Sequence, residues 1–233
     1  MFGLRLTPAE LERTVLLFAL LFLAALLLVV GRTARDALFL TLFPVSWIAP
    51  MWIAYGVASS IAGLGYAALA PRLPRARFTM GFAVFAAGTY AALRILIGQD
   101  VRPAYLVFYV WSEIIANFTA VLIWAIAQDL HDPRSAKRLF GLIGAGRVIG
   151  TVACGFGAGA AVALIRTEDL IFVLIAALLA VAVITKILAA RHPLPVPSGA
   201  AEQALTARLE STPVWRSRYA LSVALFTLLL FAV

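Results

Sequence analysis

Long apolar segments are the feature that most constrains this chain. Six of them follow one another, each about 20 residues long or longer, and a seventh apolar run comes after them. A helix of about 20 residues crosses a hydrocarbon core about 30 Å thick. The apolar residues are continuous and do not alternate with polar ones, which favours helices over the strands of a barrel. The sequence therefore predicts an all-α integral membrane protein whose surroundings are a lipid bilayer.

Composition excludes the other classes that these features could suggest. Only 13% of the residues are charged, against about 25% in ordinary soluble domains. A secretory signal peptide is the alternative for the first segment, but no small-residue cleavage site closes it and five more segments follow. The formal charge of +8 resides mostly in short loops, so membrane topology explains it and we expect no nucleic-acid partner.

The predicted spans divide the chain into three parts. Residues 1–190 hold a six-helix transmembrane bundle, residues 191–218 a cytoplasmic linker, and residues 219–233 the start of a seventh helix. The expected spans are residues 14 to a point between 30 and 43, then 47–70, 78–98, 105–128, 139–165 and 170–190. The last run of 15 residues would measure about 22 Å, too short for a full crossing. We therefore expect the natural protein to continue, with a short seven-span protein as the alternative.

Lysine and arginine are unevenly distributed among the loops. They collect before the first span, in residues 71–77 and 131–138, and in the linker, whereas loops 98–103 and 166–169 carry one arginine each. Because an excess of these residues marks the cytoplasmic side, the N-terminus and the linker are predicted to be cytoplasmic.

Several residue types argue against enzyme, metal or cofactor chemistry. Cys154 is the single cysteine, and His131 and His192 stand alone in loops, so we expect no disulfide, metal site or cofactor. No nucleophile elbow or kinase motif is present, and we expect no enzyme activity.

Glycines are concentrated in the fifth span. Gly146 and Gly150, and likewise Gly155 and Gly159, form pairs that predict close packing between helices. A dinucleotide-binding fingerprint is the rejected alternative, because the order is G-x-G-x-x-x-G and lies inside a span.

Charged residues interrupt the first span near its end. If the helix stopped at Arg32, the apolar residues 37–43 would lie uncovered in water. If it continues to Pro44, then Arg32, Arg35 and Asp36 lie on one face at helical spacing. The alternatives are a charged cavity lining and a salt-bridged helix end outside the membrane.

The fourth and fifth spans carry further polar groups at depth. Glu113, Asn117 and Trp124 share one helix face, as a cavity lining would, and Arg147 lies about 13 Å below the start of its span. A charge within a span costs at least about 2.5–3.5 kcal/mol and normally faces a cavity or a partner. Simple pairing of Glu113 with an arginine is the alternative. Arg94 is close enough to Gly98 to reach the outer interface.

These residues predict one polar cavity. In it Arg32, Arg35 and Arg147 face Glu113 and Asp36, and the net positive charge favours a small anionic substrate. Guanidinium forks match phosphate or carboxylate groups. We expect Asn117 and Trp124 to line the path as further substrate-binding residues, and Glu113 and Asp36 to act in coupling or gating.

Three strings of this sequence resemble a known family. They are ARDALFL (34–40), WSEIIANFTAVLIWAIAQDL (111–130) and DPRSAKRLFGLIGAGRVIG (132–150). In order and spacing they resemble the ATP/ADP translocase-type nucleotide antiporters of intracellular bacteria and plastids. They are still more similar to free-living bacterial relatives in the major facilitator superfamily.

The resemblance implies two six-helix halves around a central site, alternating access and a location in the bacterial cytoplasmic (inner) membrane. The present chain would be the N-terminal half, with the C-terminal half of the same transporter as its partner. The family requires a basic residue at the end of span one and an acidic residue in span four, which correspond to Arg35 and Glu113.

Two positions depart from the family pattern. Arg35 stands where the nucleotide antiporters carry lysine, and Arg147 where they carry an uncharged polar residue. The resemblance therefore implies transport of an organic or phosphorylated anion, with nucleotide exchange as one form of it. The competing hypothesis is a membrane anchor or sensor module that does not transport and is fused to soluble domains.

Overall fold

The structure is a computed structural model, and it describes residues 7–69, 73–164 and 166–192. Within this part the helices are α1 (Pro8–Leu42), α2 (Ile48–Leu69), α3 (Arg75–Gly98), α4 (Arg102–Leu130), α5 (Pro133–Leu164) and α6 (Leu170–Arg191). Two short 3₁₀ turns, η1 (Val45–Trp47) and η3 (Thr167–Asp169), precede α2 and α6. All six helices of the described residues are long and apolar enough to cross a membrane, which confirms the prediction of an all-α membrane protein.

The predicted seventh helix and nearly all of the predicted linker lie outside the described residues. The helices otherwise follow the predicted spans, except that α1 and α5 begin six residues earlier than predicted. Local capping explains the early start of α1. The hydroxyl of Thr7 accepts a hydrogen bond from the Glu10 backbone N–H, and the Glu10 carboxylate accepts one from the Thr7 N–H. This capping box and Pro8 at the first position start a helix in polar sequence.

Helix α1 is continuous through Gly31. Its 35 residues measure about 52 Å, well beyond the thickness of a hydrocarbon core. The helix ends at Leu42 because Phe43 precedes Pro44 and is extended, with φ −124° and ψ 141°. Arg32, Arg35 and Asp36 therefore lie on one helix, as expected if the first span continues to Pro44.

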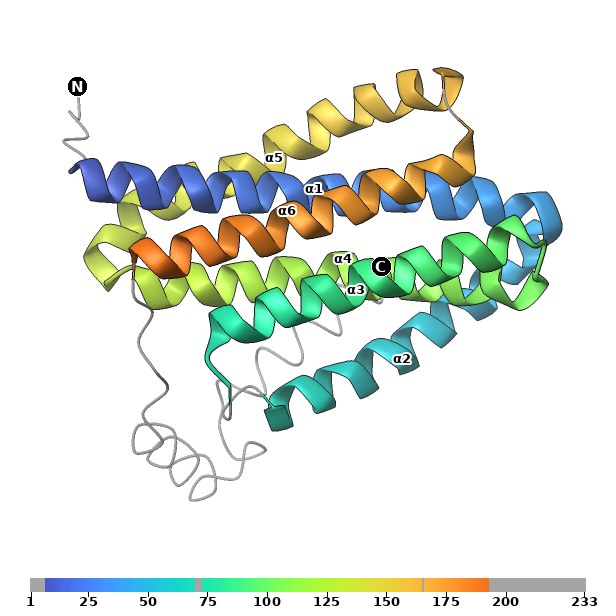
Figure 1. The fold of residues 1–233 in the computed structure, drawn as a ribbon, viewed down its shortest axis with the longest axis horizontal. Helices are drawn as coiled ribbons and strands as arrows, with labels where there is room; N and C mark the ends of the chain where they lie inside the picture. The colour runs from blue at the N-terminus through green and yellow to red at the C-terminus, as the bar shows by residue number, and fades with distance from the viewer. Residues whose placement is uncertain (1–6, 70–72, 165, 193–233) are drawn as a thin grey trace, which may run out of the picture. The chain divides into compact units, whose positions relative to one another are not determined.

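Helix α1 is also the centre of the described bundle. It packs against α4, α5 and α6, while α3 packs against α4 and α6 (Figure 1). Buried leucines along its length, among them Leu17, Leu20 and Leu27, form the middle of the apolar core. Helix α2 packs mainly against α4, and Met51 is its only buried residue.

Polar contacts join the N-terminal end of α1 to its neighbours. Glu10 pairs with Arg138 of α5 at 3.2 Å, and Glu12 pairs with Arg191 of α6. The Arg13 guanidinium donates to the Leu130 carbonyl at the end of α4, at 3.0 Å. Each of these exposed pairs contributes little stability, but together they fix which helix ends meet.

Two glycines allow α5 to approach α1 closely. A Cβ atom on Gly146 would lie 2.5 Å from the carbonyl oxygen of Phe18, and one on Gly150 would lie 2.9 Å from the Cβ of Ala25. Gly155 is different, because a Cβ there would meet nothing within 4 Å. Its predicted packing role is not seen in the described chain, because α5 diverges from α1 toward its C-terminal end (Figure 1). The surroundings of Gly159 lie outside the described side chains.

This geometry predicts opposite effects of alanine at two glycines of α5. We expect Gly146→Ala to lower the free energy of unfolding by about 1–3 kcal/mol, because the added methyl group overpacks the contact with Phe18. Gly155→Ala is the matched control and should be neutral or stabilising by up to about 1 kcal/mol, since alanine favours helix. Thermal unfolding of the purified protein in detergent measures both. Equal losses of unfolding free energy in Gly146→Ala and Gly155→Ala would contradict this account of the α1–α5 contact.

Candidate functional site

Charged and aromatic side chains from three helices meet near the middle of α4. Helical spacing brings the α1 residues Arg32, Arg35 and Asp36 to one face, and Glu113 and Asn117 to one face of α4. The first turns of α2 add Trp52 and Tyr55. We call this set, together with Tyr109 of α4, the ion cluster.

The carboxylate of Glu113 is the centre of the ion cluster. Its side chain is only 2% exposed. Arg32 donates to it twice, from Nη2 to Oε1 at 2.5 Å and from Nε to Oε2 at 3.1 Å. Arg35 Nη1 donates to Oε2 at 2.7 Å, and Asn117 Nδ2 donates to Oε1 at 3.2 Å. A buried carboxylate is tolerated when charged donors satisfy it in this way.

Arg35 is enclosed on every side. Its side chain is 3% exposed, and its Nε donates to Asp36 Oδ1 at 3.0 Å. The guanidinium carbon lies 4.4 Å from the ring centroid of Tyr109 and 5.4 Å from that of Trp52, which is the geometry of cation–π contacts. Phe39 packs on Tyr109 with the ring centroids 4.7 Å apart. Two carboxylates and two aromatic rings therefore hold this arginine.

Arg32 occupies the edge of the ion cluster. Its side chain is 47% exposed, and within the described residues Glu113 is the one group to which it donates hydrogen bonds. The two arginines that share Glu113 thus differ in environment, although they lie three residues apart on one helix.

Asn117 connects α2 to the ion cluster. Its Nδ2 lies 3.2 Å from the Tyr55 hydroxyl and 2.9 Å from the carbonyl oxygen of Glu113. Tyr55 in turn packs edge-on against Trp52, with the ring centroids 5.9 Å apart. This polar contact matters because apolar packing holds α2 only weakly.

The predicted site residues Arg147 and Trp124 lie at a different level of the bundle. Gly146, the neighbour of Arg147, lies against Phe18, which precedes Arg32 by 14 residues on α1, or about 21 Å along the helix. Trp124 lies beside Gly144 and packs on Phe140 with the ring centroids 5.6 Å apart. An arginine side chain cannot span that separation. Among the described residues the Arg147 guanidinium has no hydrogen-bond or ion-pair partner.

Without Arg147 the charges of the ion cluster balance. Two guanidinium groups face two carboxylates, those of Glu113 and Asp36. The prediction of a net positive cavity counted Arg147 among the residues of that cavity. Because Arg147 lies elsewhere, the ion cluster has no excess of positive charge. An anion that bound here would therefore have to displace one of the existing pairs.

Three aromatic residues of the ion cluster were missed from the sequence. Trp52 and Tyr55 carry no charge and lie in a span with no other marker. Tyr109 could have been found, since it precedes Glu113 by one helical turn. The outer arginine Arg94 reaches Gly98 at the end of α3, as expected. It pairs with Asp169 at 2.8 Å and Glu168 at 3.7 Å, which joins α3 to η3.

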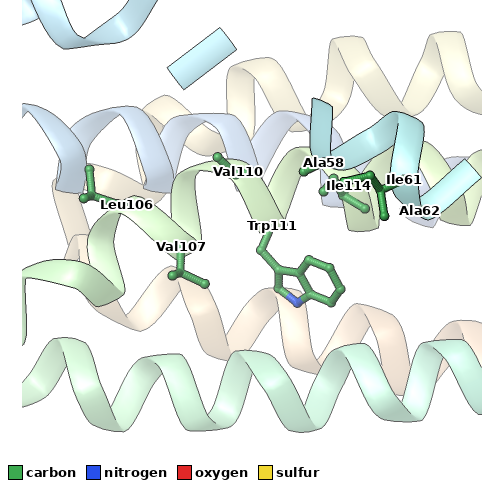
Figure 2. Close-up of a pocket in the computed structure, with 8 residues that line it drawn as sticks. All are labelled: Ala58, Ile61, Ala62, Leu106, Val107, Val110, Trp111 and Ile114. Carbon is green, nitrogen blue, oxygen red and sulfur yellow. The ribbon is translucent and has the colours of Figure 1, made fainter. Parts of the chain in front are cut away.

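A groove separate from the ion cluster lies between α2 and α4 and measures about 510 Å³. Figure 2 shows its lining of Ala58, Ile61, Ala62, Leu106, Val107, Val110, Trp111 and Ile114. The single polar atom of these side chains, the indole nitrogen of Trp111, donates to the Thr89 hydroxyl at 2.8 Å. This apolar lining suits hydrocarbon and offers an anion no partner, so the ion cluster is the candidate functional site.

Comparison of the chain with models of protein families, with curated proteins and with solved structures finds no match. The functional reading of the site therefore rests on its residues and geometry.

The environment of Arg35 predicts a large stability effect. We expect Arg35→Gln to lower the free energy of unfolding by about 3 kcal/mol or more, because Glu113 loses one of two cations in a buried setting. Arg166→Gln is the control, since that side chain is 75% exposed and should contribute less than about 1 kcal/mol. Thermal unfolding in detergent compares the two. A small effect at Arg35 would contradict a structural role for the buried pair.

Proposed function

We propose that this chain is the N-terminal half of a major-facilitator-type transporter, which moves an organic or phosphorylated anion by alternating access. The observation that carries the proposal is the meeting of Arg32 and Arg35 with Glu113 inside a bundle of membrane-length helices. Charges at such depth are costly, and in membrane proteins they mark substrate or ion pathways.

The chemistry of the ion cluster supports an anionic substrate. Guanidinium groups present paired N–H donors that match carboxylate and phosphate oxygens. Arg32 already holds the Glu113 carboxylate with two such donors, and the same two donors would hold an external anion. The aromatic rings of Trp52, next to Arg35, and of Tyr55, next to Asn117, provide flat apolar surface for the rest of an organic anion.

Exposed apolar faces agree with a second half of the protein. Ile53 of α2 is 70% exposed and Phe156 of α5 is 82% exposed. Lipid or a partner bundle would cover these faces, and in transporters the substrate site lies between two such bundles. Nucleotide exchange is a narrower form of the proposal, supported by the sequence resemblance alone.

A non-transporting membrane anchor or sensor module is the second candidate. The charge balance of the ion cluster favours it, because a static structural element would have every charge paired as seen here. The two candidates differ in whether the cluster ever opens.

Transport measurements test the proposal directly. We expect Arg35→Ala and Glu113→Gln to reduce uptake by about tenfold or more, because each removes a charged hydrogen bond at the site. The assay is uptake of labelled ATP, inorganic phosphate and succinate by the full-length protein in proteoliposomes. Arg166→Gln should transport normally, and all variants should insert into membranes. Normal uptake by Arg35→Ala would count against the proposal, and no uptake of any anion would favour the anchor.

Cysteine labelling tests the proposed orientation in the bacterial cytoplasmic membrane. With Cys154 replaced by serine, a cysteine at Gln99, between α3 and α4, should react with an impermeant maleimide on intact cells. A cysteine at Leu73, between α2 and α3, should react only after permeabilisation, because its loop is rich in arginine. The reverse pattern would place the N-terminus outside.

A further inference from the structure

The two arginines on Glu113 are held very differently. Arg35 is 3% exposed and has contacts on all sides, whereas Arg32 is 47% exposed and donates hydrogen bonds, within the described residues, to Glu113 alone. We propose that Arg32 is the mobile anion-binding side chain of the site, and that a carboxylate or phosphate group of the substrate takes the place of Glu113 on it. The inference rests on the proposed transport function of the same site.

Arg35 is fixed by its environment and acts as a positioning residue. Leaving its place would break the pairs with Glu113 and Asp36 and both contacts with aromatic rings. The buried Glu113 would lose one of its two cations at the same time, and such losses are strongly unfavourable. Arg35 therefore stays on Glu113 whether or not a substrate is bound.

Arg32 can leave Glu113 without stranding a buried charge. After its departure the carboxylate still accepts from Arg35 Nη1 at 2.7 Å and from Asn117 Nδ2 at 3.2 Å. The guanidinium itself moves toward the open side of the ion cluster, where it is already half-exposed. The exchange therefore breaks one of the two ion pairs of Glu113, and the pair that breaks is the solvated one.

Glu113 serves in this scheme as an internal stand-in for the substrate anion. It occupies both the Nε and the Nη2 donors of Arg32, the fork that an external carboxylate or phosphate would use. An incoming anion must compete with it, so the empty site is stable and affinity is moderate. Removing the internal carboxylate should therefore increase affinity for external anions and leave their transport impaired.

Inorganic phosphate is the probe for this competition. Its apparent dissociation constant is measured from the rise in melting temperature of the full-length protein in detergent, because a ligand of the folded state raises stability. We expect Glu113→Gln to bind phosphate at least about tenfold more tightly than the wild type, since a competing charged hydrogen bond is gone. Arg32→Gln should lose the phosphate response, alone and combined with Glu113→Gln. Arg166→Gln should behave as the wild type.

Stability without phosphate gives a second, independent readout. Arg32→Gln should change the melting temperature little, whereas Arg35→Gln should lower it clearly, so that the loss of binding in Arg32→Gln cannot come from misfolding. If Glu113→Gln does not fold, Glu113→Asp takes its place, because its shorter side chain reaches Arg32 less well.

The outcomes separate this inference from the proposed function. A phosphate response that survives in Arg32→Gln overturns the role of Arg32, while loss of uptake in Arg35→Ala would still support transport. The inference is also overturned if phosphate raises the melting temperature of neither the wild type nor the Glu113 variant. If, in addition, the wild type takes up none of the anions in proteoliposomes, the proposed transport function is overturned as well.

Discussion

A buried carboxylate between two guanidinium groups is the interaction on which the rest of the site depends. Glu113 is shielded from water, so its charge is tolerable only while cations from another helix reach it. That requirement fixes how α1 and α4 are rotated against each other and demands that α1 stay helical past Gly31. It also explains the aromatic rings around Arg35, since Tyr109 and Trp52 accept a cation where water is excluded.

The bundle combines firm and loose attachments. Gly146 and Gly150 let α5 contact the backbone of α1, and the leucines of α1 fill the core between α3, α4 and α6. Helix α2 has little of this packing, and its link to the ion cluster runs through the Asn117–Tyr55 hydrogen bond and the face of Trp52. Away from the ion cluster, Tyr66 of α2 packs on Phe78 of α3 and Phe118 of α4. A helix held by few contacts is the one that moves most easily.

The sequence predicted the helices well because hydropathy and length decide them in a membrane. It placed the starts of α1 and α5 too late because their first turns are polar, which lowers their hydropathy. Helix α1 is capped by Thr7, and α5 begins with Pro133. Helical spacing also grouped Arg32 with Arg35 and put Glu113 at similar depth. It could not exclude Arg147, since depth within one span does not give the distance to another helix. The neutral rings of Trp52 and Tyr55 carried no signal in the sequence that distinguishes a contact with the ion cluster from ordinary core packing.

The continuous course of α1 has a mechanical consequence. A straight α-helix resists stretching, because every residue is tied to its neighbours by backbone hydrogen bonds. The same rod carries Arg32 and Arg35 near one end and, at the other, Glu10 and Glu12 in contact with α5 and α6. A small tilt imposed where the guanidinium groups lie therefore becomes a sideways displacement about 35 Å away, where Glu10 and Glu12 contact α5 and α6. One helix thus connects the ion cluster mechanically to the far end of the bundle.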